Sequence, residues 1–143
     1  MSRHLILKLT LLITLFSCGV RAYVKADTLD YWHVKYNGKL IRKYNKTVDN
    51  NSGRVISINS KTVKTSDRIT VNYGRDTPCH DCTTELLLET YTKKQFTIVS
   101  GKGTLNPLSF SVVDVKKWGG KSFDVFYREK GRRDILLFSI KFT

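Results

Sequence analysis

The chain has 143 residues, 41% of them hydrophobic, and its 25 Lys and Arg residues against 12 Asp and Glu give a formal net charge of +13. This length allows one ordinary domain, and the apolar and aromatic content excludes a disordered polyelectrolyte. The three glutamates carry no acid–base signature, and no glycine-rich loop fits a phosphate-binding template. The sequence therefore gives no positive indication of an enzyme or of a cofactor.

Residues 1–22 are typical of a secretory signal. A basic start precedes the apolar run Leu9–Phe16, and Val20-Arg21-Ala22 offers small residues at the positions that a signal peptidase reads. The apolar run is too short to span a bilayer, which takes about 20 apolar residues. We therefore expect cleavage after Ala22, a single secreted or periplasmic domain over residues 23–143, and no transmembrane segment once the signal is removed.

A second cleavage position is open. Leu15-Phe16-Ser17-Cys18 resembles the lipobox of bacterial lipoproteins, in which the cysteine is lipidated and becomes the first residue. This resemblance implies a membrane anchor at Cys18. Cleavage after Ala22 instead leaves 121 of the 143 residues, with 22 basic and 12 acidic side chains, a net charge of +10 and two cysteines.

The composition of residues 23–143 favours strands. There is one Ala and no Met, and 31 of the 121 residues are Thr, Val or Ile, which pack well on pleated sheets. Apolar and polar residues alternate in Trp32–Tyr36, Ile69–Tyr73 and Phe123–Val125. We predict an all-β fold, an antiparallel β-sandwich that is immunoglobulin-like in outline, with eight or nine short strands. Its predicted core contains Trp32, Val34, Ile58, Val71, Ile98, Phe110, Val125, Phe138 and Ile140.

Further local features follow from the same patterns. Asn37-Gly38 is a strong two-residue hairpin signal, because both turn residues need positive φ. Asp114–Trp118 is expected to form one helical turn. The hairpin turn predicts three cross-strand pairs, Tyr36 with Lys39, Val34 with Ile41, and Trp32 with Lys43. Alternation in the last run predicts one common face for Leu136, Phe138, Ile140 and Phe142.

The most distinctive local motif is Cys79-His80-Asp81-Cys82, for which three interpretations remain open. An even cysteine count in an exported protein favours a disulfide between Cys79 and Cys82. Metal binding would use Cys79, His80 and Cys82 with Asp81, but a closed site needs ligands from separated segments, and there is no second cysteine pair. We therefore predict no metal.

The third interpretation is redox chemistry. A strand, then Cys79-His80-Asp81-Cys82, then a segment Thr83–Lys94 that could be helical resembles the local order of thioredoxin-like oxidoreductases. The resemblance implies a reactive dithiol formed by Cys79 and Cys82. Under this alternative His80 would stabilise the thiolate.

Basic and aromatic residues alternate around the Asn37-Gly38 turn. Cations attract polyanions and aromatic faces can stack on sugars or bases, so we predict a binding surface for an anionic glycan, lipid headgroup or protein surface. Export excludes intracellular nucleic acid. The alternative is a solvated surface in which lysines protect edge strands and cover aromatic rings. The predicted binding residues are Trp32, Tyr36, Lys39, Arg42 and Lys43.

Two further basic groups lie in the C-terminal third: Lys116, Lys117 and Lys121 around Trp118, and Arg128, Lys130, Arg132 and Arg133.

These observations predict a small exported, non-enzymatic binding or interaction module at the cell envelope or outside the cell. The alternative function is an exported thiol–disulfide protein that uses the Cys79–Cys82 pair.

Overall fold

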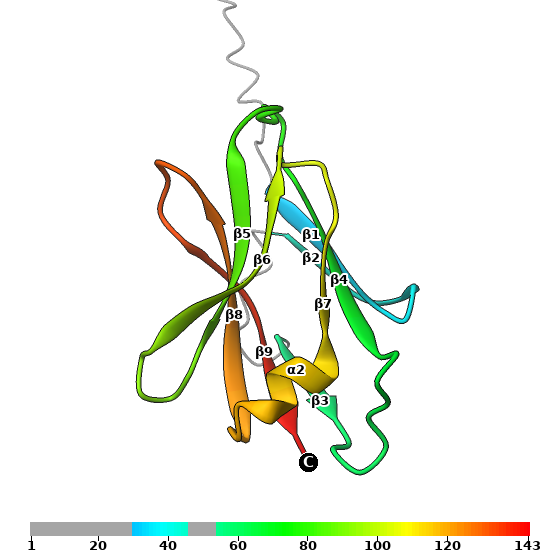
Figure 1. Ribbon diagram of the computed structural model, residues 1–143. Helices are drawn as coiled ribbons and strands as arrows, with labels where there is room; N and C mark the ends of the chain where they lie inside the picture. Colours follow the sequence, from blue (N-terminus) through cyan, green and yellow to red (C-terminus); the bar gives the residue numbers. More distant parts are fainter. Residues whose placement is uncertain (1–29, 46–53) are drawn as a thin grey trace, which may run out of the picture.

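The computed structural model describes residues 30–45 and 54–143, which form two facing β-sheets (Figure 1). The first sheet has four strands in the order β2 (Lys39–Asn45), β1 (Tyr31–Tyr36), β4 (Arg68–Gly74) and β7 (Leu108–Ser111). The second has five in the order β3 (Val55–Ile58), β9 (Ile135–Phe142), β8 (Ser122–Glu129), β5 (Thr83–Glu89) and β6 (Gln95–Lys102). The predicted all-β sandwich is confirmed. One departure is the β3–β9 pair, which is parallel in an otherwise antiparallel arrangement.

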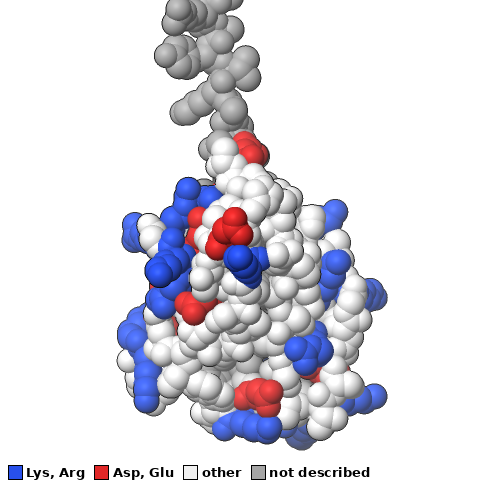
Figure 2. Space-filling view, turned by 45° about the horizontal axis from the view of Figure 1, so that its top comes forward, with Lys and Arg blue, Asp and Glu red and all other residues white. Residues whose placement is uncertain are grey.

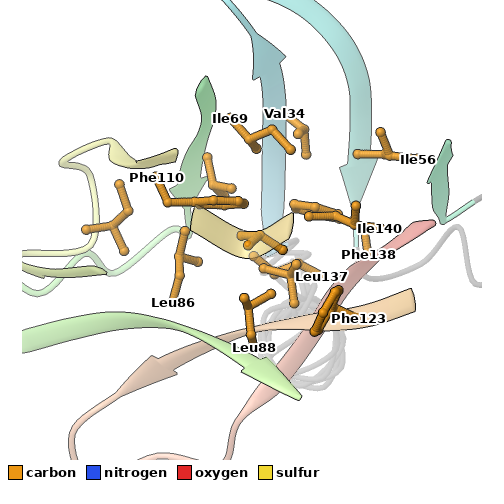
Figure 3. Packing of buried hydrophobic residues seen from close by; sticks show 14 of the residues in the cluster. Val34, Ile56, Ile69, Leu86, Leu88, Phe110, Phe123, Leu137, Phe138 and Ile140 are labelled. Carbon is orange, nitrogen blue, oxygen red and sulfur yellow. The ribbon is translucent and has the colours of Figure 1, made fainter. Parts of the chain in front are cut away.

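The core lies between the two sheets, where buried side chains from both sheets pack against one another (Figure 3). Trp32 is only 1% exposed, and its Nε1 donates a hydrogen bond to the Leu137 carbonyl oxygen in the opposite sheet at 3.2 Å. Eight of the nine predicted core residues are buried. The ninth, Ile98, is half-buried and packs against the same cluster.

The first hairpin turns where predicted, but its strand register differs. Asn37 and Gly38 have φ of 49° and 80°, and Tyr36 pairs with Lys39. Beyond that pair a β-bulge makes Ile41 an extra residue. The predicted Val34–Ile41 and Trp32–Lys43 pairs are therefore wrong, and the observed pairs are Val34–Arg42 and Trp32–Tyr44. The bulge places an aromatic ring beside buried Trp32, with ring centroids 5.6 Å apart, where regular pairing would place a lysine charge.

The predicted alternation in the last strand, β9, is also partly wrong. Val125 pairs with Phe138 and Phe126 pairs with Leu136, so Leu137 is the extra residue of a bulge in β9. Leu137 is 0% exposed, whereas Leu136 is half-buried and off the core face. The predicted face therefore keeps Phe138, Ile140 and Phe142 but not Leu136. A bulge lets two consecutive residues, Leu137 and Phe138, both contribute to the core.

The predicted helical turn is present as α2 (Val112–Lys117), which begins two residues before the expected Asp114. The Ser111 side chain caps it by accepting from the Asp114 N–H, and Val112 and Val115 are buried. Among the residues that the structure describes, no helix has the length and hydropathy needed to cross a membrane. The predicted signal and Cys18 lie outside the described residues.

Candidate functional site

A cavity of about 650 Å³ opens at one end of the sandwich, between the two sheets. The end of β4 and the beginning of β1 form one side, because Tyr31 pairs with Gly74. The β8–β9 hairpin forms the other side. The loop from β4 to β5 crosses between the sheets at this end, which Figure 1 shows at the top. We call this space the end cavity. Its charged lining residues are Asp30, Arg54, Arg75, Glu129, Arg132, Arg133 and Asp134.

A buried ion-pair cluster forms the polar wall of the end cavity. Arg75 Nη2 lies 3.0 Å from Glu129 Oε1, and the two side chains are only 9% and 8% exposed. Arg132 Nε lies 3.2 Å from the same oxygen, from the solvent side. Glu129 is thus shared by two guanidinium groups, so this cluster carries one positive charge more than its carboxylate offsets.

Two further charged residues of the lining, Arg54 and Asp134, are also held in place. The Arg54 guanidinium lies over the Trp32 ring, 5.4 Å from its centroid, and its Nη1 donates to the Leu136 carbonyl oxygen. Asp134 accepts two hydrogen bonds from Arg128, at 2.8 and 2.7 Å. Figure 2, turned toward this end of the molecule, shows Lys and Arg around the edges of this face, most densely on the left, where acidic side chains lie among them.

Two buried donors in the wall of the end cavity have no hydrogen-bond partner among the described residues. They are Arg75 Nε and the Tyr127 hydroxyl. The Tyr127 ring stacks on Tyr73, with centroids 4.1 Å apart and planes 18° apart. Burial, with the Glu129 charge nearby, raises the pKa of Tyr127, so its hydroxyl stays protonated and able to donate.

The Cys79–Cys82 loop borders this cluster. The Cys82 N–H donates to Cys79 Sγ at 2.9 Å, and Thr104 N–H donates to the Cys79 carbonyl at 2.8 Å. Gly103 has φ of 80°, and a Cβ there would lie 2.9 Å from the His80 carbonyl oxygen, so only glycine fits against the loop. Both half-buried cysteines are thiols in this structure, and a Glu129 carboxylate oxygen lies within 4.8 Å of both sulfurs.

The two thiols differ in acidity. A hydrogen bond from the Cys82 side chain, followed by backbone N–H groups, holds the pKa of Cys79 below its usual value. Burial raises the pKa of Cys82 to about 11, and the bond to Cys79 and the Glu129 charge act in the same direction. Cys79 is therefore the thiol of the pair that loses its proton more readily.

The other two residues of the motif, His80 and Asp81, lie at the surface. Asp81 forms an ion pair with Lys102 at 3.1 Å. Within the described ranges, the donor atoms close enough to share a metal belong to Cys79, Cys82 and Glu129, so the ligand set considered from the sequence is not brought together. His80 was expected to stabilise a thiolate, but no contact between His80 and either sulfur supports this role.

The segment after Cys82 is a strand. The redox alternative expected Thr83–Lys94 to be helical, and this is wrong: Thr83–Glu89 forms β5, which pairs with both β6 and β8. Leu86, Leu87 and Leu88 are all buried. A central strand can bury three consecutive residues, whereas an amphipathic helix buries only one face. Cys79 and Cys82 therefore lack the helix N-terminus that the thioredoxin-like resemblance implied.

The predicted surface at the first hairpin is only partly a surface. Lys39, Arg42 and Lys43 are exposed. Trp32 is buried and unavailable for stacking, and the half-buried Tyr36 donates its hydroxyl to Asp67 Oδ2 at 2.7 Å. We call Lys39, Arg42 and Lys43 the basic hairpin. It offers three cations without the two aromatic partners that were expected, Trp32 and Tyr36.

The end cavity was not predicted from the sequence. Arg132 and Arg133 belong to the basic group in the C-terminal third, whereas Arg75 and Glu129 have no local sequence signal that connects them. They lie 54 residues apart and meet only because Thr84 pairs with Glu129 across β5 and β8, next to the loop that carries Arg75.

No protein-family model matches this chain, and no curated protein matches it either. Function is therefore inferred from the geometry of the site.

Proposed function

We propose that this protein is a small exported, non-enzymatic binding module, and that its anionic partner binds in the end cavity. The observation that carries the proposal is buried Arg75, whose Nε–H has no hydrogen-bond partner among the described residues. A guanidinium withdrawn from water interacts strongly with an anion, because the surrounding dielectric screens the attraction weakly. Arg132 and Arg133 extend the positive charge toward the mouth of the cavity.

Arginine is suited to this task because its planar fork can make two parallel hydrogen bonds to a carboxylate, sulfate or phosphate. A volume of about 650 Å³ accommodates a compact ligand or one unit of a longer chain. Anionic glycans, lipid headgroups and acidic protein surfaces all present such groups. The basic hairpin is the competing location on the same molecule.

The test compares these two locations with dextran sulfate as the polyanion probe. The variant Arg132→Gln/Arg133→Gln should weaken binding about tenfold or more and flatten the salt dependence of the affinity, because charge contacts release counterions. The matched control, Lys39→Gln/Arg42→Gln/Lys43→Gln, should change affinity much less. Isothermal titration calorimetry at several salt concentrations measures both. A larger loss from the hairpin triple variant would move the site to the basic hairpin and contradict the proposal.

Export is the second part of the proposal. The mature chain should begin at Tyr23 or at a lipidated Cys18, and an intact mass measured on protein from its native host separates the two. A native chain that still begins at Met1 would contradict export.

Thiol–disulfide exchange is a second candidate function, favoured by the unequal acidity of Cys79 and Cys82. It expects turnover in an insulin-reduction assay and a trapped mixed disulfide on Cys79 in the Cys82→Ser variant. Under the leading proposal the two cysteines form a structural disulfide in the exported protein, and neither result is expected.

A further inference from the structure

The two donors without partners are unusual because both are almost fully buried. The Arg75 side chain is 9% exposed and Tyr127 is 2% exposed, yet Arg75 Nε and the Tyr127 hydroxyl form no hydrogen bond with any described residue. A buried donor without an acceptor destabilises the folded protein. Both residues line the end cavity. Such donors are expected where a ligand supplies the missing acceptor.

We infer that Arg75 Nε and the Tyr127 hydroxyl bind the carboxylate of an acidic saccharide in the end cavity. This inference rests on the proposed function and specifies the ligand class of that same site. A carboxylate supplies acceptor oxygens only, which is what two donors require.

The charge of the cluster favours a singly charged group. Arg75 and Arg132 contribute two positive charges and Glu129 one negative charge, all joined through Glu129 Oε1. One carboxylate balances the surplus charge. A doubly charged phosphate would place a further negative charge near the buried Glu129 carboxylate, where like charges repel strongly.

The acidic part of the lining favours a saccharide over a simple anion. Asp30 and Asp134 also line the end cavity, so its wall presents carboxylate oxygens beside the arginine cations. Arg128 holds Asp134 in a fixed orientation. Sugar hydroxyls can donate hydrogen bonds to carboxylates such as these. A ligand with one carboxylate and several hydroxyls therefore complements both signs of charge in the cavity.

The decisive variant is Tyr127→Phe, which removes only the hydroxyl and keeps the ring that stacks on Tyr73. We expect it to weaken binding of D-glucuronate about tenfold, because a hydrogen bond to a charged group is lost. We also expect its melting temperature without ligand to rise, because a buried unpaired hydroxyl is gone. The matched control is Tyr91→Phe, at a tyrosine that is 88% exposed, and neither quantity should change there.

NMR titration gives the affinities for D-glucuronate, D-glucose and glucose 6-phosphate, and calorimetry gives the melting temperatures. Glucuronate should bind best of the three. A Tyr127→Phe variant with unchanged affinity and a lower melting temperature would show that the hydroxyl has a structural partner such as water, and would overturn the inference. Glucose 6-phosphate binding as tightly as glucuronate would overturn the charge argument.

The two proposals fail separately. If dextran sulfate binds through Arg132 and Arg133 while glucuronate does not bind, the saccharide inference is wrong and the proposed function stands. The same holds if an acidic peptide binds in place of glucuronate. If neither dextran sulfate nor glucuronate binds, both are wrong.

Discussion

At the scale of single residues, Asp67 shows how one buried carboxylate joins two segments. It accepts hydrogen bonds from the Tyr36 hydroxyl at 2.7 Å, from Asn37 Nδ2 at 2.8 Å and from the Lys64 N–H at 2.9 Å. Asn37 Oδ1 in turn accepts from the Arg68 N–H, which ties the hairpin turn to the start of β4. The hairpin turn is therefore fixed by tertiary contacts as well as by its own sequence.

These hydrogen bonds make the stability of the folded protein depend on pH in the acidic range. The Lys64 backbone, then Asn37 and Tyr36, hold the pKa of Asp67 below its usual value of 3.8. The stabilisation is therefore complete above the unfolded-state pKa and is lost as pH falls through the lower folded-state pKa. Urea unfolding at a series of acidic pH values should show this loss, and Asp67→Asn should be less stable near neutral pH with a flatter acid limb. An unchanged acid limb in Asp67→Asn would contradict this assignment.

At the scale of elements, β-bulges decide which residues reach the core. Each of the bulges in β2 and β9 inserts one residue, Ile41 and Leu137, and shifts the face of every residue beyond it. The bulge in β9 also places the Leu137 carbonyl oxygen where Trp32 Nε1 can donate to it. This hydrogen bond between the two sheets thus involves the extra residue of the bulge.

The bulge in β9 predicts unequal effects for two adjacent leucines. Leu137→Ala should reduce the free energy of unfolding by about 2–5 kcal/mol, the usual cost of truncating a buried leucine. Leu136→Ala is the matched control and should cost clearly less, because Leu136 is only half-buried. Urea denaturation of both variants measures the difference. Equal losses, or a larger loss for Leu136→Ala, would indicate the regular register that alternation predicts.

At the scale of the whole molecule, the β4–β5 loop joins the two sheets and carries the Cys79–Cys82 pair. The Gly103 N–H donates to the Cys82 carbonyl at 2.9 Å, so the loop is also fixed to the segment between β6 and β7. The core between the sheets contains no contribution from either cysteine. Loss of the pair should therefore loosen the end of the sandwich without removing the fold.

We predict that Cys79 and Cys82 are oxidised to each other in protein isolated from its native host. The variant Cys79→Ser/Cys82→Ser should remain folded but melt about 5 °C lower, because a disulfide that closes so short a loop contributes little. Mass spectrometry after alkylation under non-reducing conditions measures the oxidation state, and circular dichroism follows melting. Alkylation of both thiols in protein isolated from its native host would contradict the disulfide.

Local sequence patterns determined much of this fold. β-branched residues and period-two alternation predicted the strands and nine core positions, of which eight are buried, and Asn37-Gly38 predicted the first turn. These features depend on neighbours in the chain, since side-chain direction alternates along any strand and positive φ is a property of the turn residues themselves.

Only the tertiary structure decided the register, the parallel β3–β9 pair and the end cavity. Whether Tyr44 or Lys43 lies beside Trp32 depends on the cost of burying a charge between the sheets, which no local pattern contains. Arg75 and Glu129 meet through the pairing of strands distant in sequence. The sequence alone shows that the molecule is basic and rich in strands. Strand pairing and burial determined that Arg75 is withdrawn from water beside Glu129 and so belongs to a candidate site.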